Sequence, residues 1–191
     1  IRWDENFSAK AAALIEENNQ WSEPGLAKYL SEKLVNGTTL FISSSRPIRD
    51  LEAFAKPRSG VEVFANRGLA GIDGNLSTAI GIASKRDCTY AVVGDLAFLH
   101  DLTALVNQEP VKLKLLVINN NGGGIFSTLP QAGVDGFERI FGTPHNQNLT
   151  KIISGFGIES EVIKSESELK RAKVKTEVIH LASLVALSKS R

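Results

Sequence analysis

Residues 90–93 read Tyr-Ala-Val-Val and residues 115–118 read Leu-Leu-Val-Ile, and these two runs decide the fold. Neither run alternates apolar with polar residues, as a strand with one face in water would do. Continuous apolar strands are typical of parallel sheets, whose two faces are both covered by helices. We therefore predict an α/β fold built on an open, mostly parallel sheet.

Other short apolar or β-branched runs alternate with helix-like stretches around these two. Strands are predicted over residues 38–42, 61–65, 89–93, 113–118 and 177–181. Helices are predicted over residues 5–18, from the N-cap Ser22 to about Gly37, and over 76–84, 97–106, 148–155 and 166–172. Strands that alternate with helices in this way favour a parallel sheet with helices on both faces.

Length, charge and cysteine content narrow the class of protein. The 191 residues are ample for one core, and the formal net charge of +1 provides no basic stripe, so no nucleic-acid partner is expected. No apolar run approaches the roughly 20 residues of a membrane helix. The single cysteine, Cys88, excludes an internal disulfide and a cysteine-based zinc site, and it favours a reducing cytoplasm. Because the chain begins at Ile1 and contains no Met, we expect a piece of a longer protein.

Polar or glycine-rich segments follow four of the predicted strands, at residues 43–46, 66–68, 94–95 and 119–124. Ligands of open α/β sheets bind beyond the carboxyl ends of the strands, so these segments should share one rim. There, the Asp95 carboxylate, the Asn120 amide oxygen and a backbone carbonyl would give the oxygen ligands that Mg²⁺ prefers. Glycines after Asn120 would admit a phosphate, and a helix from Ala97 would add its positive end.

Each half of this pattern also has a plain structural interpretation. Gly94-Asp95 can cap a helix, and residues 119–124 can form a turn. Their occurrence at consecutive strand ends favours the metal and phosphate interpretation. Neither G-x-x-x-x-G-K-[ST] nor G-x-G-x-x-G after a strand competes with it, and the glycines from Gly68 to Gly74 are interpreted as a tight turn.

Longer strings resemble a known family. Gly94-Asp95, a helix and then Asn119-Asn120 resemble the magnesium-diphosphate motif of thiamine-diphosphate-dependent enzymes. Four longer strings resemble one branch of that family, the menaquinone-pathway enzymes. They are NRGLAGIDG at 66–74, GDLAFLHD at 94–101, NNNGGGIFS at 119–127 and FERIFGTPH at 137–145. Leu96 departs from the glycine that most relatives of the wider family have at the third position of the metal motif.

The resemblance implies the thiamine-diphosphate-binding fold and a domain organisation. Residues 1–20 would be a helical lead-in or linker from a central domain, and residues 21–191 the domain that binds the cofactor diphosphate. The activating glutamate would lie in a separate N-terminal domain, so no catalytic residue is expected here and the isolated chain should be inactive. The full-length protein would be a homodimer or a dimer of dimers.

The resemblance also implies roles for individual residues. The metal, Mg²⁺ or Mn²⁺, would be bound by Asp95, Asn120 and the Gly122 carbonyl. Thiamine diphosphate would contact Gly94, Asp95, Leu96, Asn120, Gly122, Gly123, Ile72 and Ile125. The substrates would contact Ser45, Arg49, Arg67, Phe126 and Leu129, the two arginines through carboxylates.

The implied enzyme is a transferase of menaquinone biosynthesis that decarboxylates 2-oxoglutarate and adds the succinyl-semialdehyde carbanion to isochorismate. Two alternatives stay open: a thiamine-diphosphate enzyme of the acetolactate synthase type, and a noncatalytic α/β module that binds a phosphate ligand. Arg49 and Arg67 favour the menaquinone-pathway enzyme over the acetolactate synthase type, since small 2-oxo acids need fewer carboxylate anchors than 2-oxoglutarate and isochorismate. His145 is expected to be a surface or helix-capping residue, and Asp101 a helix-surface residue.

Overall fold

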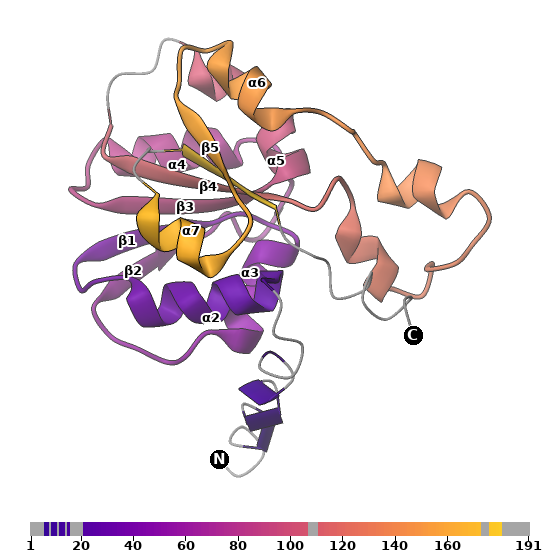
Figure 1. Ribbon diagram of the computed structural model, residues 1–191, viewed down its shortest axis with the longest axis horizontal. Coiled ribbons are helices and arrows are strands. Elements are labelled where there is room, and N and C mark those ends of the chain that lie inside the picture. Colours follow the sequence, from indigo (N-terminus) through magenta and orange to yellow (C-terminus); the bar gives the residue numbers. More distant parts are fainter. Residues whose placement is uncertain are drawn as a thin grey trace.

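A computed structural model describes residues 6–7, 9–10, 12–13, 15, 21–106 and 111–172, and the backbone of 176–180. These described residues form a six-stranded sheet in the order β2-β1-β3-β4-β6-β5, and every neighbouring pair is parallel (Figure 1). The strands are β1 (Thr38–Ile42), β2 (Val61–Phe64), β3 (Thr89–Gly94), β4 (Leu113–Asn119), β5 (Ser160–Ile163) and β6 (Thr176–His180). The predicted α/β fold with a parallel sheet is confirmed.

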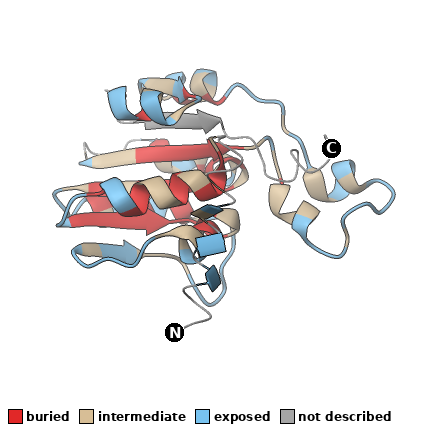
Figure 2. Cartoon of the chain, turned by 60° about the horizontal axis from the view of Figure 1, so that its bottom comes forward, coloured by how far each residue is buried: buried red, intermediate tan, exposed pale blue. Residues whose placement is uncertain are grey.

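Helices cover both faces of the sheet. On one face lie α4 (Asn75–Ala83), α5 (Asp95–His100) and α6 (Leu149–Ser154), which pack around the buried Phe41 and Phe98. On the other lie α2 (Glu23–Lys33), α3 (Arg46–Phe54) and α7 (Glu166–Arg171), which pack around Leu26, Leu40 and Leu116. Buried residues therefore concentrate in the central strands and in the helix surfaces that contact them (Figure 2).

Local sequence explains where several helices begin and end. Ser22 is the N-cap of α2, as predicted, and its Oγ accepts a hydrogen bond from the Gly25 N–H at 3.3 Å. The helix ends at Lys33, before Gly37, because the C-cap Leu34 already has an extended backbone with a ψ of 133°. Gly37, with a φ of +87°, lies in the turn that leads into β1. Helix α5 starts at Asp95, two residues before the predicted start, directly at the end of β3.

Among the described α-helices and strands, α3 and β5 were not predicted. Helix α3 follows a run of three serines, and it starts after Ser45, whose φ of +77° turns the chain sharply out of β1. Strand β5 reads Ser-Glu-Val-Ile, so it has no continuous apolar run, and it lies at the edge of the sheet. Half of the predicted helix over 5–18 falls outside the described residues, and the seven residues described there are helical. No helix in the described part of the chain combines the length and apolarity needed to cross a membrane.

The sheet brings the predicted rim segments together at one edge. Ile42 pairs with Val92, and Gly94 pairs with Ile118, so the ends of β1, β3 and β4 lie next to one another. The segment after β2 joins them, because Ser44 Oγ donates to the carbonyl of Asn66 at 3.4 Å.

Candidate functional site

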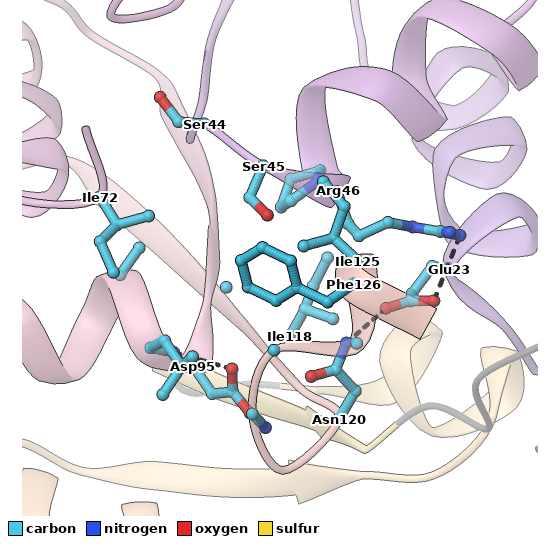
Figure 3. A pocket seen from close by; sticks show the side chains of 17 residues that line it. Glu23, Ser44, Ser45, Arg46, Ile72, Asp95, Ile118, Asn120, Ile125 and Phe126 are labelled. Carbon is cyan, nitrogen blue, oxygen red and sulfur yellow. Dashed lines mark hydrogen bonds and ion pairs between the residues drawn. The ribbon is translucent and has the colours of Figure 1, made fainter. Parts of the chain in front are cut away.

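A pocket of about 150 Å³ lies at the carboxyl ends of β1, β3 and β4 (Figure 3). Its walls come from the segment after each of these strands, from the start of α2 and from the loop after β2. The lining residues are Glu23, Ser44, Ser45, Arg46, Pro47, Ile72, Gly94, Asp95, Leu96, Ala97, Ile118, Asn120, Gly122, Gly123, Gly124, Ile125 and Phe126. Ten of the predicted site residues belong to this set, whereas Arg49, Arg67 and Leu129 do not.

The Asp95 carboxylate joins two walls of the pocket. Asp95 is 2% exposed, and its Oδ1 accepts from the Leu96 N–H at 2.7 Å. Its Oδ2 accepts from the Gly122 N–H at 2.9 Å and lies 3.1 Å from Nε2 of His145. The carboxylate is therefore held in place by donors from β3–α5, from the loop after β4 and from a segment fifty residues away in sequence.

His145 takes part in the site, and its expected role as a surface or helix-capping residue is wrong. The His145 side chain is 10% exposed, and its Nδ1 accepts a hydrogen bond from the Gln147 N–H at 3.0 Å. Since Nδ1 acts as an acceptor, the proton of a neutral ring lies on Nε2, which then donates to Asp95. Sequence reasoning missed this pair because His145 lies in a loop after a long connection.

Asn120 contributes one satisfied and one unsatisfied polar atom. Its Nδ2 donates to Oε1 of Glu23 at 2.8 Å. Its Oδ1 is buried and has no hydrogen-bond partner. Figure 3 shows this oxygen turned toward the side of the pocket where Asp95 lies. A buried acceptor without a donor is costly unless something else binds it.

Glu23 begins a charged network that sequence reasoning did not identify. The Glu23 carboxylate is 3% exposed, and its Oε2 lies 3.5 Å from Nη2 of Arg46. Arg46 also binds Asp50 one helical turn away, through Nη2 to Oδ1 at 3.0 Å and Nε to Oδ2 at 3.1 Å. The i,i+4 spacing of Arg46 and Asp50 was the available signal for their pair. Nothing in the sequence near Glu23 indicated its contact with Asn120.

Burial raises the pKa of Asp50 to about 6, against an ordinary value of 3.8. Desolvation is the largest cause, and the neighbouring Glu23 carboxylate adds to it. The Arg46 guanidinium opposes both by favouring the charged form. With both carboxylates ionised, two negative charges share one guanidinium, so the network carries a surplus of negative charge beside the pocket.

The glycines after Asn120 are required by a close backbone approach within the protein. A Cβ on Gly122, whose φ is +132°, would lie 2.2 Å from the Gly142 carbonyl oxygen. A Cβ on Gly123 would lie 2.2 Å from the Phe141 carbonyl oxygen, and the Gly123 N–H donates to Gly142 at 2.7 Å. A Cβ on Gly94 would meet no atom within 4 Å, so protein packing leaves open space at this position.

Apolar side chains form the remaining wall. Ile72, Ile118, Ile125 and Phe126 line the pocket beside Asp95 and Asn120 (Figure 3). The Phe126 ring packs against Phe141, with ring centroids 5.6 Å apart. Leu129 lies beyond this wall and is 39% exposed.

The two predicted substrate arginines lie together, but outside the pocket. Arg49 and Arg67 line a separate open groove beside α3 that includes Lys56. Arg49 is linked to the pocket through Ser45, because its Nη1 donates to the Ser45 carbonyl at 2.8 Å. Both arginine side chains are exposed to solvent.

Asp101 has a structural role that sequence reasoning assigned wrongly to the surface. It is 8% exposed and accepts from the Ser77 N–H at 2.7 Å and from Ser77 Oγ at 2.9 Å. Ser77 lies in the first turn of α4, so Asp101 supplies the acceptor that the N-cap, Gly74, lacks. The contact ties the end of α5 to the start of α4.

The donor set fits a hard divalent cation. It has one carboxylate (Asp95), one orphaned amide oxygen (Asn120) and nearby backbone carbonyls, all of which are oxygen ligands. The described residues contain no group of three or more His, Cys, Asp or Glu side chains placed to hold a metal.

Comparisons with known proteins agree with this geometry. Residues 49–181 match the family model described as "Thiamine pyrophosphate enzyme, C-terminal TPP binding domain". The chain is similar to the 2-succinyl-5-enolpyruvyl-6-hydroxy-3-cyclohexene-1-carboxylate synthases of Thermobifida fusca, Corynebacterium glutamicum and Myxococcus xanthus. Identities are 40%, 38% and 45%, over 83%, 89% and 75% of this chain. The chain spans 30%, 35% and 26% of the length of these curated relatives.

A solved structure shares the fold. It comes from Mycobacterium smegmatis, and it superimposes with a TM-score of 0.62. The match covers 86% of this chain and 32% of the other, at 20% sequence identity.

Proposed function

This chain belongs to the thiamine pyrophosphate enzyme family through the C-terminal TPP binding domain, and we propose that it is the cofactor-binding part of a 2-succinyl-5-enolpyruvyl-6-hydroxy-3-cyclohexene-1-carboxylate synthase. The curated relatives that carry this name support the assignment. The chain's role would be to hold the diphosphate end of thiamine diphosphate through a divalent cation, Mg²⁺ or Mn²⁺.

One observation carries the proposal: Asn120 Oδ1 is buried, lacks a donor and faces the pocket (Figure 3). A cation there would be bound by this oxygen, by the Asp95 carboxylate and by the Gly122 carbonyl. Both side chains offer oxygen atoms to the pocket, and no group among the described residues donates a hydrogen bond to Asn120 Oδ1. These residues would hold the cation, whose positive charge would neutralise the diphosphate of the cofactor.

The diphosphate would lie against Gly94, Leu96 and Gly123. The space beside Gly94 supports this, since no protein atom lies within 4 Å of a Cβ built there. The N–H groups of all three residues already have acceptors within the protein. Diphosphate binding would therefore exchange or share some of these hydrogen bonds.

The apolar wall would receive the rest of the cofactor. Ile72, Ile125 and Phe126 provide an apolar surface. Fixed charges would act more strongly there once further domains excluded water from the site. When bound, thiamine diphosphate supplies a nucleophilic carbon that can add to the carbonyl of a 2-oxo acid, and a ring that can take up the electron pair released when carbon dioxide leaves. The chain's own residues hold and orient it.

The proposed reaction is a transferase reaction of menaquinone biosynthesis, with 2-oxoglutarate and isochorismate as small-molecule substrates. Ser45, Phe126 and Leu129 would contact the substrates, and Arg49 and Arg67 would bind their carboxylates. The other part of the active site, including the activating glutamate, would come from further domains and a second subunit of a homodimer. A cytoplasmic location is proposed from Cys88, the free cysteine of the described chain.

Calorimetric titration of the full-length protein tests the proposal. Thiamine diphosphate should bind in a Mg²⁺-dependent manner, and ADP or inorganic diphosphate should bind more weakly. Asp95→Ala should abolish the Mg²⁺ dependence while circular dichroism shows an unchanged fold. Equal binding of all diphosphates would favour a noncatalytic phosphate-binding module. Turnover of pyruvate in place of 2-oxoglutarate would favour an acetolactate synthase type of enzyme.

A further inference from the structure

We propose that Glu23 is a positioning residue that fixes the orientation of the Asn120 side-chain amide and so turns Asn120 Oδ1 toward the metal site. The inference rests on the proposed function, because it requires Asn120 to be a metal ligand. It assigns a role to a residue of α2 that lies 97 positions away from Asn120 in the sequence.

An amide can face its neighbours in two ways, and only one of them binds a cation. A carboxylate accepts hydrogen bonds and donates none. Glu23 Oε1 lies 2.8 Å from Asn120, so the NH₂ group of Asn120 must face Glu23 and its oxygen must face the other way. Glu23 is 3% exposed, so bulk water does not replace this contact. The result is the orphaned oxygen in the pocket.

Glu23 is itself held by a second contact. Its other oxygen, Oε2, lies 3.5 Å from Nη2 of Arg46. Asp50 holds the Arg46 guanidinium from the far side with two contacts of 3.0 and 3.1 Å. The network therefore runs from α3 through α2 to the loop after β4, and each oxygen of Glu23 has a separate partner (Figure 3).

Replacing Glu23 by Gln separates orientation from packing, because the two side chains have the same shape. Arg46 has donors only, so it would take the oxygen of the new side chain. The NH₂ group of Gln would then face Asn120. Asn120 would have to flip, presenting its oxygen to Gln and its NH₂ group to the metal site. Metal binding should weaken although no atom of the pocket wall has been removed.

A second substitution restores the site if this account is right. Asn120→Asp alone places two carboxylates against each other in a buried position, which disfavours both charges. In the double variant Glu23→Gln/Asn120→Asp, one aspartate oxygen accepts from Gln and the other faces the metal. Both oxygens of a carboxylate can accept a hydrogen bond or bind a cation, so either orientation of the new aspartate side chain serves. The double variant should therefore bind metal again. A merely structural role of Glu23 would not produce this rescue.

The experiment measures Mn²⁺ affinity by electron paramagnetic resonance in the full-length protein, with thiamine diphosphate present. We expect Glu23→Gln and Asn120→Asp each to weaken binding about tenfold or more, in the range of effects seen for groups that orient metal ligands. The double variant should recover most of the affinity. Glu32→Gln is the matched control, since Glu32 lies on the same helix in a surface pair with Lys56 and should leave Mn²⁺ affinity unchanged.

A second measurement needs no metal. Hydrogen exchange of the Asn120 side-chain NH₂ group should be slow in the wild type, where it donates to Glu23, and fast after Glu23→Gln, where it faces the pocket. Wild-type Mn²⁺ affinity in Glu23→Gln, or failure of the double variant to recover affinity, would overturn the role of Glu23. Unchanged affinity after Asn120→Ala would instead overturn the proposed metal site itself.

Discussion

Nε2 of His145 lies 3.1 Å from Oδ2 of Asp95, and the ring's other nitrogen accepts the Gln147 N–H. The histidine therefore approaches the proposed metal ligand as a donor from a segment fifty residues further along the chain. Asp95 Oδ2 also accepts from the Gly122 N–H. These donors fix the carboxylate in one rotamer before any ligand arrives.

We expect His145→Ala to weaken Mg²⁺-dependent binding of thiamine diphosphate by about tenfold to a hundredfold, because Asp95 loses the only side-chain contact that the described part of the chain gives its carboxylate and keeps only its two backbone donors. The folded structure should persist, since His145 lies in a loop and not in the hydrophobic core. Calorimetric titration at several Mg²⁺ concentrations measures the effect. His100→Ala is the control, because His100 is exposed at the end of α5. Equal loss of affinity in both variants would contradict the role given to His145.

The glycines of the site should respond in opposite ways to alanine. Gly122→Ala should lower the free energy of unfolding by about 2 kcal/mol or more, because its φ is +132° and the new Cβ would meet the Gly142 carbonyl. Gly94→Ala should leave stability nearly unchanged and weaken cofactor binding, since only a ligand would fill that space. Urea unfolding and calorimetric titration measure the two effects.

Gly81→Ala is the matched control for these variants. Gly81 lies in the exposed middle of α4, with no atom near the built Cβ, and alanine there should add about 0.5–1 kcal/mol of stability. Cofactor affinity should not change. If Gly94→Ala behaved like Gly81→Ala in both assays, the diphosphate would not lie against Gly94.

Much of this site was predictable because the relevant signals are local. Asp95 and Asn120 each directly follow a buried strand. The geometry of a parallel sheet brings such positions to one edge. The resemblance drawn from the glycine-rich strings is confirmed by the family match over residues 49–181. Contacts between distant segments carried no such signal. The pairs Glu23–Asn120 and His145–Asp95 depend on how helices and loops fold back over the sheet.

Helix α3 shows the same limit in the fold itself. Only Ser43, Ser44 and Ser45 separate β1 from α3, and the turn is made by Ser45, which has a positive φ although it is not glycine. The sequence therefore contained no glycine to mark the change from strand to helix. The serines before it were interpreted as part of the polar rim, and Ser44 and Ser45 do line the pocket. That interpretation did not include a helix after them. Asp50 was consequently not recognised as a buried partner of Arg46.

Asp50 should make stability depend on pH in a defined direction. Burial raises its pKa to about 6, above the ordinary 3.8, so the folded state binds more protons than the unfolded state between these values. Its contribution is therefore fully present below about pH 4 and is lost as the pH rises through 6. A shift of this size corresponds to about 3 kcal/mol.

Comparison with Asp50→Asn isolates this contribution. The difference in free energy of unfolding, wild type minus variant, should fall as the pH is raised from 4 to 7, whatever constant offset the substitution adds. Urea unfolding at several pH values measures it, and carbon NMR of the Asp50 carboxyl gives the pKa directly. A measured pKa below 4 would mean that the Arg46 ion pair outweighs the cost of burial.

The exposed arginines beside α3 should affect substrate but not cofactor. Arg49→Ala and Arg67→Ala should raise the KM for 2-oxoglutarate or isochorismate, because a guanidinium binds a carboxylate through two parallel hydrogen bonds. Replacement by Lys should restore little, since its ammonium lacks that fork. Lys56→Ala, in the same groove, is the control for a general loss of positive charge. Loss of cofactor affinity in both arginine variants would place them in the diphosphate site instead.

The isolated chain of 191 residues should not turn over substrate. Its pocket of about 150 Å³ presents one charged end and one apolar wall, and the proposed site needs a glutamate and further walls from other domains. The segment that follows Phe126 has exposed apolar side chains, among them Val134 and Ile140, which further domains could cover. A cofactor held only at its diphosphate would leave its reactive ring in water, where fixed charges are weak. The assay is carbon dioxide release from 2-oxoglutarate in the presence of isochorismate. Turnover near about 1 s⁻¹, within the ordinary enzyme range, would show that this chain holds a complete active site.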